Sequence, residues 1–414
     1  MARRVEEKTG ERGMNSIRNE VQNVSRPLLL AVVILVGLNL RPFLTTIGPL
    51  TPSIREATGL SLQSVSLFTL LPMALMGVFA FAGPRLQAGV GARRAVIGAL
   101  VVLCVASGLR LITSDGAALL GTAALCGLGV AIIQAVFPGI IKAHFPGRVA
   151  VVMGLYSAML MGGGALGAQL SPVVADRTGS WRIGLGWVAV PAAVALATSA
   201  LILPRESSVR AEGMGIGALL RRPRTWLLMA CFGLVNGGYS SVVAWLAPYY
   251  QSLGWTSAAS GRLLAAIATS QAIAALSIPA LAARRQDRRA WICATLLMQI
   301  AGFAGVAFLP TESTVLWAIL LGAGLGGCFA LTMVVALDHL EHPGRAGALS
   351  ALMQGGGFLI AAVPPWIVAV LHDMSGSFVS GWLLHLSCAA FVALLSLRFA
   401  PRGYARAMNV RVAT

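Results

Sequence analysis

Long apolar runs separated by short polar segments make up almost the whole chain of 414 residues. Twelve of these runs reach about 20 residues, which is the length that an α-helix needs to cross the hydrocarbon core of a bilayer. The pattern therefore predicts an all-α membrane protein with twelve transmembrane helices. They are expected at about 27–51, 60–82, 95–113, 117–141, 149–173, 183–203, 225–249, 262–282, 290–309, 315–337, 346–371 and 380–399.

The charged residues agree with this interpretation and orient the chain. Only 11% of the residues are charged, whereas soluble domains carry about 25%. The net charge of +17 does not indicate nucleic-acid binding, because the basic residues lie in short segments between the apolar runs. Most of them fall on the side of the N-terminus, which predicts that both termini lie in the cytoplasm. The outer side receives only Arg55, Arg110, Arg177, Arg182 and Arg262.

The chain divides into two halves that repeat in the same orientation. At an offset of 197 residues, Gly127-Leu128-Gly129 matches Gly324-Leu325-Gly326, and Asp176 matches Asp373. This spacing predicts two pseudo-symmetric six-helix bundles. The expected organisation is a disordered cytoplasmic tail at 1–26, an N-terminal bundle at 27–203, a cytoplasmic linker at 204–224, a C-terminal bundle at 225–399 and a cytoplasmic tail at 400–414.

Arg41 and Pro42 interrupt the first apolar run near its middle. An arginine at the centre of a bilayer costs about 2.5–3.5 kcal/mol on insertion scales, so it is kept where it meets water, a partner or a ligand. Pro42 has no N–H and deprives the carbonyl of Leu38 of its helical donor. No Asp or Glu lies deep in any predicted span, and Asp338 comes closest. We therefore expect a broken helix whose arginine meets an anionic or strongly dipolar substrate.

Further polar side chains recur in the apolar runs, where lipid offers them no partner. With Arg41 they form the predicted substrate-binding set, although each of them alone is also explained by a hydrogen bond between packed helices. Two glycines in the seventh helix, Gly237 and Gly238, are expected to loosen that helix. The other members of the set are Asn39, Thr45, Gln134, Tyr156, Asn236, Tyr239, Trp245, Gln271 and Gln354.

Two kinds of position are candidates for gating. Glycine-rich turns in the fifth and eleventh helices allow close helix contact or a hinge, and packing alone is the alternative. Charged residues at the inner ends of the second half could hold that side shut, or could form a merely solvated loop. The predicted gating residues are Gly163, Gly164, Asp287, Arg288, Asp338 and Gly356.

The spans carry none of the motifs of a membrane-embedded enzyme, such as HExxH, GxSxG or a pair of carboxylates. The six cysteines lie inside apolar runs without a CxxC pair, so we expect neither a metal site nor a cofactor. The single histidine of the twelfth helix, His385, is expected to be neutral and packed.

Several segments resemble the cyanate transporter group of the major facilitator superfamily, which includes 2-nitroimidazole transporters. The similar segments include Gly37-Leu38-Asn39-Leu40-Arg41-Pro42, Met153-Gly154-Leu155-Tyr156-Ser157 and Asn236-Gly237-Gly238-Tyr239. The resemblance implies the major facilitator fold and transport of a small solute. Together with Arg41, the resemblance favours a secondary active transporter that moves a small anion by alternating access, and cyanate is the favoured substrate. The alternative is a transporter of a neutral heteroaromatic such as 2-nitroimidazole, with Tyr239 and Trp245 stacking on it. The expected surroundings are the lipid bilayer and the small-molecule substrate, with the protein acting as a monomer.

Overall fold

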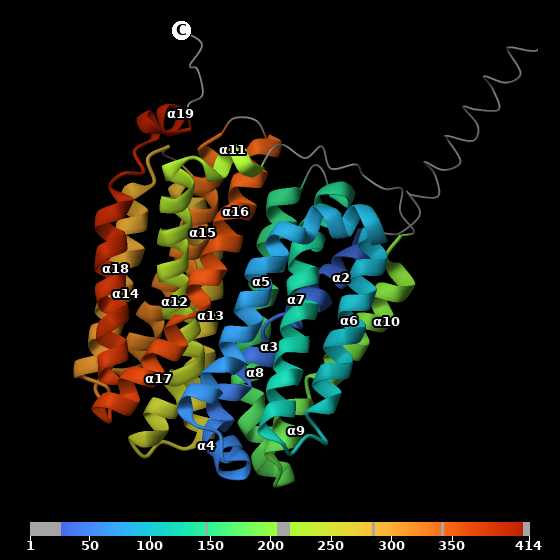
Figure 1. Ribbon diagram of the computed structural model, residues 1–414, viewed down its shortest axis with the longest axis vertical. Coiled ribbons are helices and arrows are strands. Elements are labelled where there is room, and N and C mark those ends of the chain that lie inside the picture. Colours follow the sequence, from blue (N-terminus) through green and yellow to red (C-terminus); the bar gives the residue numbers. More distant parts are fainter. Residues whose placement is uncertain (1–25, 146–147, 205–215, 284–285, 341–342, 409–414) are drawn as a thin grey trace, which may run out of the picture.

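The computed structural model describes residues 26–145, 148–204, 216–283, 286–340 and 343–408. The secondary structure of these segments is helical throughout, and twelve helices or helix pairs are long and apolar enough to cross a membrane, as predicted. Figure 1 shows the first six spans, in blue to green, beside the last six, in yellow-green to red. The predicted disorder of the N-terminal tail and most of the predicted linker fall outside the described residues.

The first half contains six spans, of which the first and the sixth are interrupted. Its helices are α2 (Arg26–Leu38), α3 (Pro42–Thr45) and α4 (Ile47–Thr58) in the first span, then α5 (Leu62–Val90), α6 (Ala92–Leu109), α7 (Gly116–His144) and α8 (Val149–Thr178), and finally α9 (Trp181–Gly186) and α10 (Ala189–Ile202) in the sixth.

The second half follows a short helix in the linker. Its helices are α11 (Ile216–Leu220) in the linker, then α12 (Pro223–Ser252), α13 (Ser257–Ala282), α14 (Arg289–Phe308) and α15 (Thr314–Asp338), then α16 (Pro343–Ala362) and α17 (Pro364–Ser375) in the eleventh span, α18 (Val379–Ser396), a 3₁₀ turn η1 (Pro401–Gly403) and α19 (Tyr404–Ala407).

Proline accounts for the interrupted spans. Pro42 begins α3, which confirms the predicted break in the first helix. Pro364 begins α17, and Pro191 lies in the first turn of α10. A proline cannot donate to the carbonyl four residues before it, so a helix tends to end just ahead of it. The sequence predicted these two spans, at about 183–203 and 346–371, but did not identify their interruptions. The loosening expected at Gly237 and Gly238 is not found, because α12 is continuous through them.

Equivalent contacts recur in the two halves. Gly179 and Gly376, which are 197 residues apart, both end their helices in the left-handed region, with φ of 65° and 71°. Arg93 donates to the carbonyl of Ala200 in the first half (2.6 Å), and Arg289 donates to the carbonyl of Leu397 in the second (3.3 Å). The repeat read from the sequence thus corresponds to repeated local structure.

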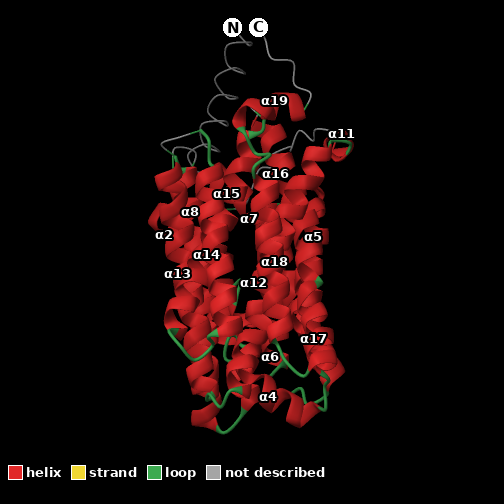
Figure 2. Cartoon of the chain, turned by 90° about the vertical axis from the view of Figure 1, so that its left-hand side faces the viewer, coloured by secondary structure: helices red, strands yellow, loops and turns green. Residues whose placement is uncertain are grey.

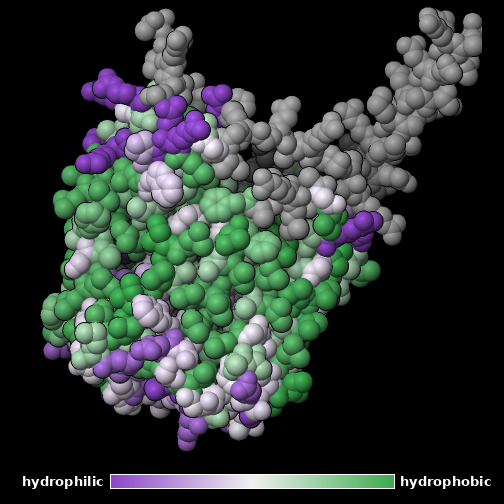
Figure 3. All heavy atoms as spheres, viewed as in Figure 1, coloured by the Kyte–Doolittle hydropathy of each residue, from purple (hydrophilic) through white to green (hydrophobic). Residues whose placement is uncertain are grey.

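The helices run roughly parallel between two ends of the molecule, with loops at both (Figure 2). We call them the α19 end, at the top of Figure 1, and the α4 end, at the bottom. Apolar residues cover the middle of the face in Figure 3, and hydrophilic residues gather near α19 and at the opposite end. This distribution is the one that a bilayer-spanning protein requires.

The two halves are joined at the α4 end. Gln251 of α12 donates to the carbonyl of Pro49 in α4 (2.8 Å), and Gln63 of α5 donates to the Asp373 carboxylate in α17 (2.9 Å). Gly48 lets α4 approach α12, because a Cβ there would lie 2.7 Å from the carbonyl oxygen of Val243. The protein is therefore in a conformation whose halves are hydrogen-bonded to one another at this end.

Candidate functional site

Arg41 lies at the break between α2 and α3. It is the residue before α3, with φ of −121° and ψ of −25°. Pro42 takes the first position of α3, where its missing N–H is not needed because the helix has no acceptor for it there. Its side chain is only 6% exposed. The local sequence therefore places a charged side chain inside the molecule, near the middle of the first span.

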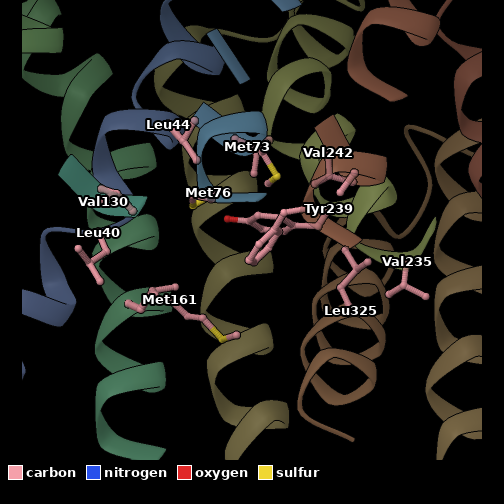
Figure 4. Packing of buried hydrophobic residues seen from close by; sticks show 14 of the residues in the cluster. Leu40, Leu44, Met73, Met76, Val130, Met161, Val235, Tyr239, Val242 and Leu325 are labelled. Atoms are coloured by element: carbon pink, nitrogen blue, oxygen red, sulfur yellow. The ribbon is translucent and has the colours of Figure 1, made fainter. Parts of the chain in front are cut away.

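The Arg41 guanidinium lies over the ring of Tyr239 in α12, with 4.8 Å between Cζ and the ring centroid. This cation–π contact joins the first half to the second. Figure 4 shows Tyr239 extending from α12 toward Met73 and Met76 of α5, so apolar side chains lie around its ring. Within the described part of the chain, Nε and Nη1 of Arg41 have no hydrogen-bond partner, and no carboxylate forms an ion pair with it.

Tyr156 of α8 adds a second phenol to this region. It is buried, its hydroxyl has no hydrogen-bond partner among the described residues, and its ring stacks on Phe137 of α7 at 5.3 Å. It is close enough to Arg41 for the two side chains to interact electrostatically. The first, fifth and seventh spans thus bring together one guanidinium and two phenols, which can donate hydrogen bonds to an anion.

Glycines of α8 accommodate the interrupted first span. A Cβ on Gly163 would collide with the carbonyl of Leu38, and one on Gly167 would lie 2.5 Å from Oγ1 of Thr45. At Gly164 a Cβ would lie 3.3 Å from Cβ of Arg41. Gly356 of α16 packs similarly, since a Cβ there would lie 2.6 Å from Sδ of Met229. The structure gives these glycines close packing contacts, and their gating role stays a prediction.

Three predicted ligands are engaged in helix packing. Asn39 donates to the carbonyls of Leu35 (2.8 Å) and Pro191 (3.1 Å), which ties α2 to α10. Asn236 donates to a carbonyl of its own helix. Trp245 is fully buried and donates to the carbonyl of Pro365 (2.8 Å), beside the ring of Phe378. Its indole is enclosed among the seventh, eleventh and twelfth spans, so the expected stacking of Trp245 on a substrate finds no support.

The remaining predicted ligands are placed as follows. Thr45 bonds only to carbonyls of its own span, and Gln271 is buried, with its backbone against Gly326 of α15. Gln134 and Gln354 are half-buried. Thr45 reaches the backbone carbonyl of Arg41 (3.4 Å), but none of these four is shown in contact with its guanidinium.

The predicted charged gate lies within the second half. Arg288 donates to the carboxylate of Asp338 (2.8 Å) and thereby joins α14 to α15. Arg289 pairs with Asp287, and its hydrogen bonds hold the pKa of that carboxyl below its usual range. In this conformation these pairs join elements of the same half, and their role in holding the inner side shut stays a prediction.

Arg110 was not proposed as a site residue from the sequence, where it was counted among the arginines of the outer side. It is fully buried and donates to the carbonyl of Phe43 in α3 (3.0 Å). Its signal was its position on the side where the distribution of positive charge disfavours arginine. His385 is packed, as expected, beside Phe303, but neither ring nitrogen has a partner among the described residues.

Comparisons with known proteins extend over nearly the whole chain. The family model for the Major Facilitator Superfamily matches residues 30–365. The chain is 43% identical to the cyanate transport protein CynX of Escherichia coli (strain K12), covering 90% of this chain and 97% of that protein. It is 26% identical to a 2-nitroimidazole transporter of the same organism, covering 91% and 95%.

Solved structures share the fold at low sequence identity. A bacterial homolog of the human lysosomal transporter Spinster, in an inward-facing and occupied conformation, aligns with a TM-score of 0.69 and 15% identity over 93% of this chain and 97% of its own. The nucleoside transporter NupG, as a D323A mutant, aligns with a TM-score of 0.73 and 12% identity over 90% and 99%.

Proposed function

The chain belongs to the major facilitator superfamily, and from that premise we propose that it is a secondary active transporter that moves a small anion, cyanate, across the bacterial inner membrane by alternating access. The identity to a cyanate transport protein supports the substrate. The buried Arg41 supports a negative charge on that substrate. The protein is a transporter and not an enzyme, like its relatives.

One observation carries the choice of an anion. Arg41 is buried with two unpartnered N–H groups and without an ion-paired carboxylate in the described residues. A buried charge that lacks a partner is strongly destabilising, and a bound anion would supply the missing charge and acceptors. Cyanate is small and carries negative charge at both of its ends. It can therefore accept from Arg41 and from the hydroxyl of Tyr156 or Tyr239 without displacing the surrounding apolar side chains.

The arginines indicate the orientation. Those of the α19 end, such as Arg94, Arg224 and Arg402, outnumber the five of the α4 end. The positive-inside rule supports an orientation in which the α19 end faces the cytoplasm, and we propose that both termini lie on that side of the membrane. The α4 end, where the halves are hydrogen-bonded, faces outward in this proposal. The protein acts as a monomer, because each chain contains both halves around Arg41.

A neutral heteroaromatic is the second candidate substrate. The rings of Tyr239 and Tyr156 lie near Arg41 and could stack on a 2-nitroimidazole whose nitro group accepts from the guanidinium. The 26% identity to a 2-nitroimidazole transporter favours this candidate. A competition assay with radiolabelled cyanate decides between the two. Unlabelled cyanate should inhibit its uptake at concentrations at which 2-nitroimidazole has no effect. Inhibition by 2-nitroimidazole at lower concentrations than by unlabelled cyanate would favour the heteroaromatic.

The test of the function is uptake of radiolabelled cyanate into proteoliposomes by the wild-type protein and by Arg41→Lys and Arg41→Ala. We expect Arg41→Ala to lose at least about a hundredfold in uptake efficiency, because a charge-assisted hydrogen bond to a desolvated anion is lost. Arg41→Lys keeps the charge but loses the planar fork, and should retain partial activity. Arg55→Ala is the matched control, since Arg55 lies in the same span but is exposed at the α4 end. Full activity of both Arg41 variants would overturn the proposal.

A further inference from the structure

Arg110 is a second buried arginine that holds the interrupted first span. It follows the last residue of α6 and is 0% exposed. Its Nη1 donates to the carbonyl of Phe43 (3.0 Å) and its Nε donates to Oγ1 of Thr122 in α7 (3.2 Å). No acidic residue pairs with it among the described residues. Like Arg41, it is a buried cation without a carboxylate.

Phe43 is part of α3, the four-residue turn that begins directly after Arg41. Residues 39–41 separate this turn from α2, whereas Thr46, in the αR region, joins it to α4. Helical hydrogen bonds therefore do not fix the rotation of α3 relative to α2. Its other side-chain hydrogen bonds come from Thr45 and Thr46 within the same span. In the described structure, Arg110 supplies the side-chain hydrogen bond that ties the backbone of α3 to another helix.

Thr122 holds Arg110 in turn. Its hydroxyl donates to the carbonyl of Leu119 (2.7 Å), so its oxygen lone pairs face the guanidinium of Arg110. This series of contacts runs from α7 through Arg110 to Phe43 and ends two residues from Arg41. A bidentate guanidinium is suited to this task because its donors lie in one rigid plane.

We propose that Arg110 is a positioning residue for substrate binding, which fixes the turn α3 so that the Arg41 guanidinium faces Tyr239 with its free N–H groups available to the anion. Its charge also raises the electrostatic potential at the break, where no carboxylate opposes it, and so favours an anion over a neutral solute of the same shape. This inference rests on the proposed function, because it assigns the anion to Arg41.

The test measures the KM of cyanate uptake and the thermal unfolding temperature of the same purified samples. Arg110→Gln should raise the KM about tenfold, because the charged donor to the carbonyl of Phe43 is lost. Thr122→Val should raise it about threefold, because only the hydroxyl that accepts from Arg110 is lost. Thr122→Ser keeps the hydroxyl and should retain the wild-type KM. Arg182→Gln is the matched control, because Arg182 also donates to a carbonyl near the α4 end, that of Thr113, but contacts no part of the first span through that bond. Its KM should change less than about twofold.

A double-mutant cycle separates positioning from general stabilisation. The Arg41→Lys variant has no guanidinium at position 41 for Arg110 to orient. In that background, Thr122→Val should change the KM by less than about twofold. Equal effects of Thr122→Val in both backgrounds would overturn the inference, as would a lowered unfolding temperature with an unchanged KM. If Arg110→Gln does not insert, the Thr122→Val and Thr122→Ser pair decides alone. Full activity of the Arg41 variants would instead overturn the proposed function, so the two failures are distinguishable.

Discussion

The carbonyl group of Leu38, which Pro42 deprives of its helical donor, lies directly against Gly163 of α8. The break that carries Arg41 therefore packs directly against the glycine-rich turn of the fifth span. The glycine at 163 is required by the approach of a backbone group and not only by a need for flexibility.

Gly163→Ala should destabilise the protein strongly, because its Cβ would meet backbone atoms that cannot move without moving the break. We expect a loss of about 3 kcal/mol or failure to insert. The neighbouring Gly162 has nothing within 4 Å of an added Cβ, so Gly162→Ala should be neutral or slightly stabilising. Thermal unfolding of the two variants in detergent measures the difference, and equal unfolding temperatures would contradict the packing role.

Arg41→Lys offers a chemical test of whether cyanate reaches the site. Isocyanic acid, the protonated form of cyanate, reacts with a neutral amine: a C–N bond forms, the amine proton passes to the cyanate nitrogen, and a urea results. If position 41 binds the substrate, cyanate is held beside the new amine, which raises its effective concentration there. We therefore expect the new amine to be carbamoylated faster than the exposed one introduced by Arg55→Lys, as measured by peptide mass spectrometry. An amine at position 41 that stays unmodified while the exposed one reacts would show that cyanate does not bind beside Arg41.

The features that could be predicted from the sequence are local ones. The length of each apolar run predicts a span, and Pro42 after Arg41 predicts the break, because both effects act within a few residues. The side of a buried helix that faces the site could not be predicted in this way. Every residue from Val235 to Tyr250 is buried, so no polar face distinguished the side of Tyr239 from that of Trp245. The sequence therefore proposed both as ligands, whereas the structure encloses Trp245 among helices of the second half.

Arg110 shows the same limit for contacts distant in sequence. It binds the backbone of Phe43, which lies 67 residues earlier. A carbonyl oxygen is present at every residue, so the sequence does not single out the one that an arginine will meet. The charged pairs show the same limit, because the pattern of charges does not tell whether Arg288 and Asp338 come from facing halves or from the same one.

Gln251→Leu should favour opening at the α4 end. The substitution removes the hydrogen bonds from Gln251 to the carbonyl of Pro49 and to Oγ of Ser260, each worth about 1 kcal/mol. The first of these bonds joins the halves, so we expect about a fivefold shift toward the open arrangement. Spin labels on the exposed positions Glu56 and Arg262, placed in a background without native cysteines, report the separation of the halves.

Gln169→Leu is the control for that measurement, because Gln169 is an exposed glutamine on α8 and makes no hydrogen bond between the halves. Its distance distribution should match that of the parent protein. An unchanged distribution in Gln251→Leu as well would mean that the bond to Pro49 does not contribute to closure.

His339 should make the stability of the α19 end depend on pH. It lies just beyond the end of α15, buried and stacked on Tyr404 of α19 at 3.9 Å, and it faces Arg224 and Asp338. Burial lowers its pKa from 6.5 to about 4. The unfolded chain therefore binds a proton between these values that the folded protein does not, so stability is complete above about pH 6.5 and falls by up to about 3 kcal/mol as the pH drops toward 4. Thermal unfolding of the wild-type protein and of His339→Phe, which keeps the stacking but cannot titrate, should differ in slope across this range. A pH dependence that is unchanged in His339→Phe would assign the effect to other groups.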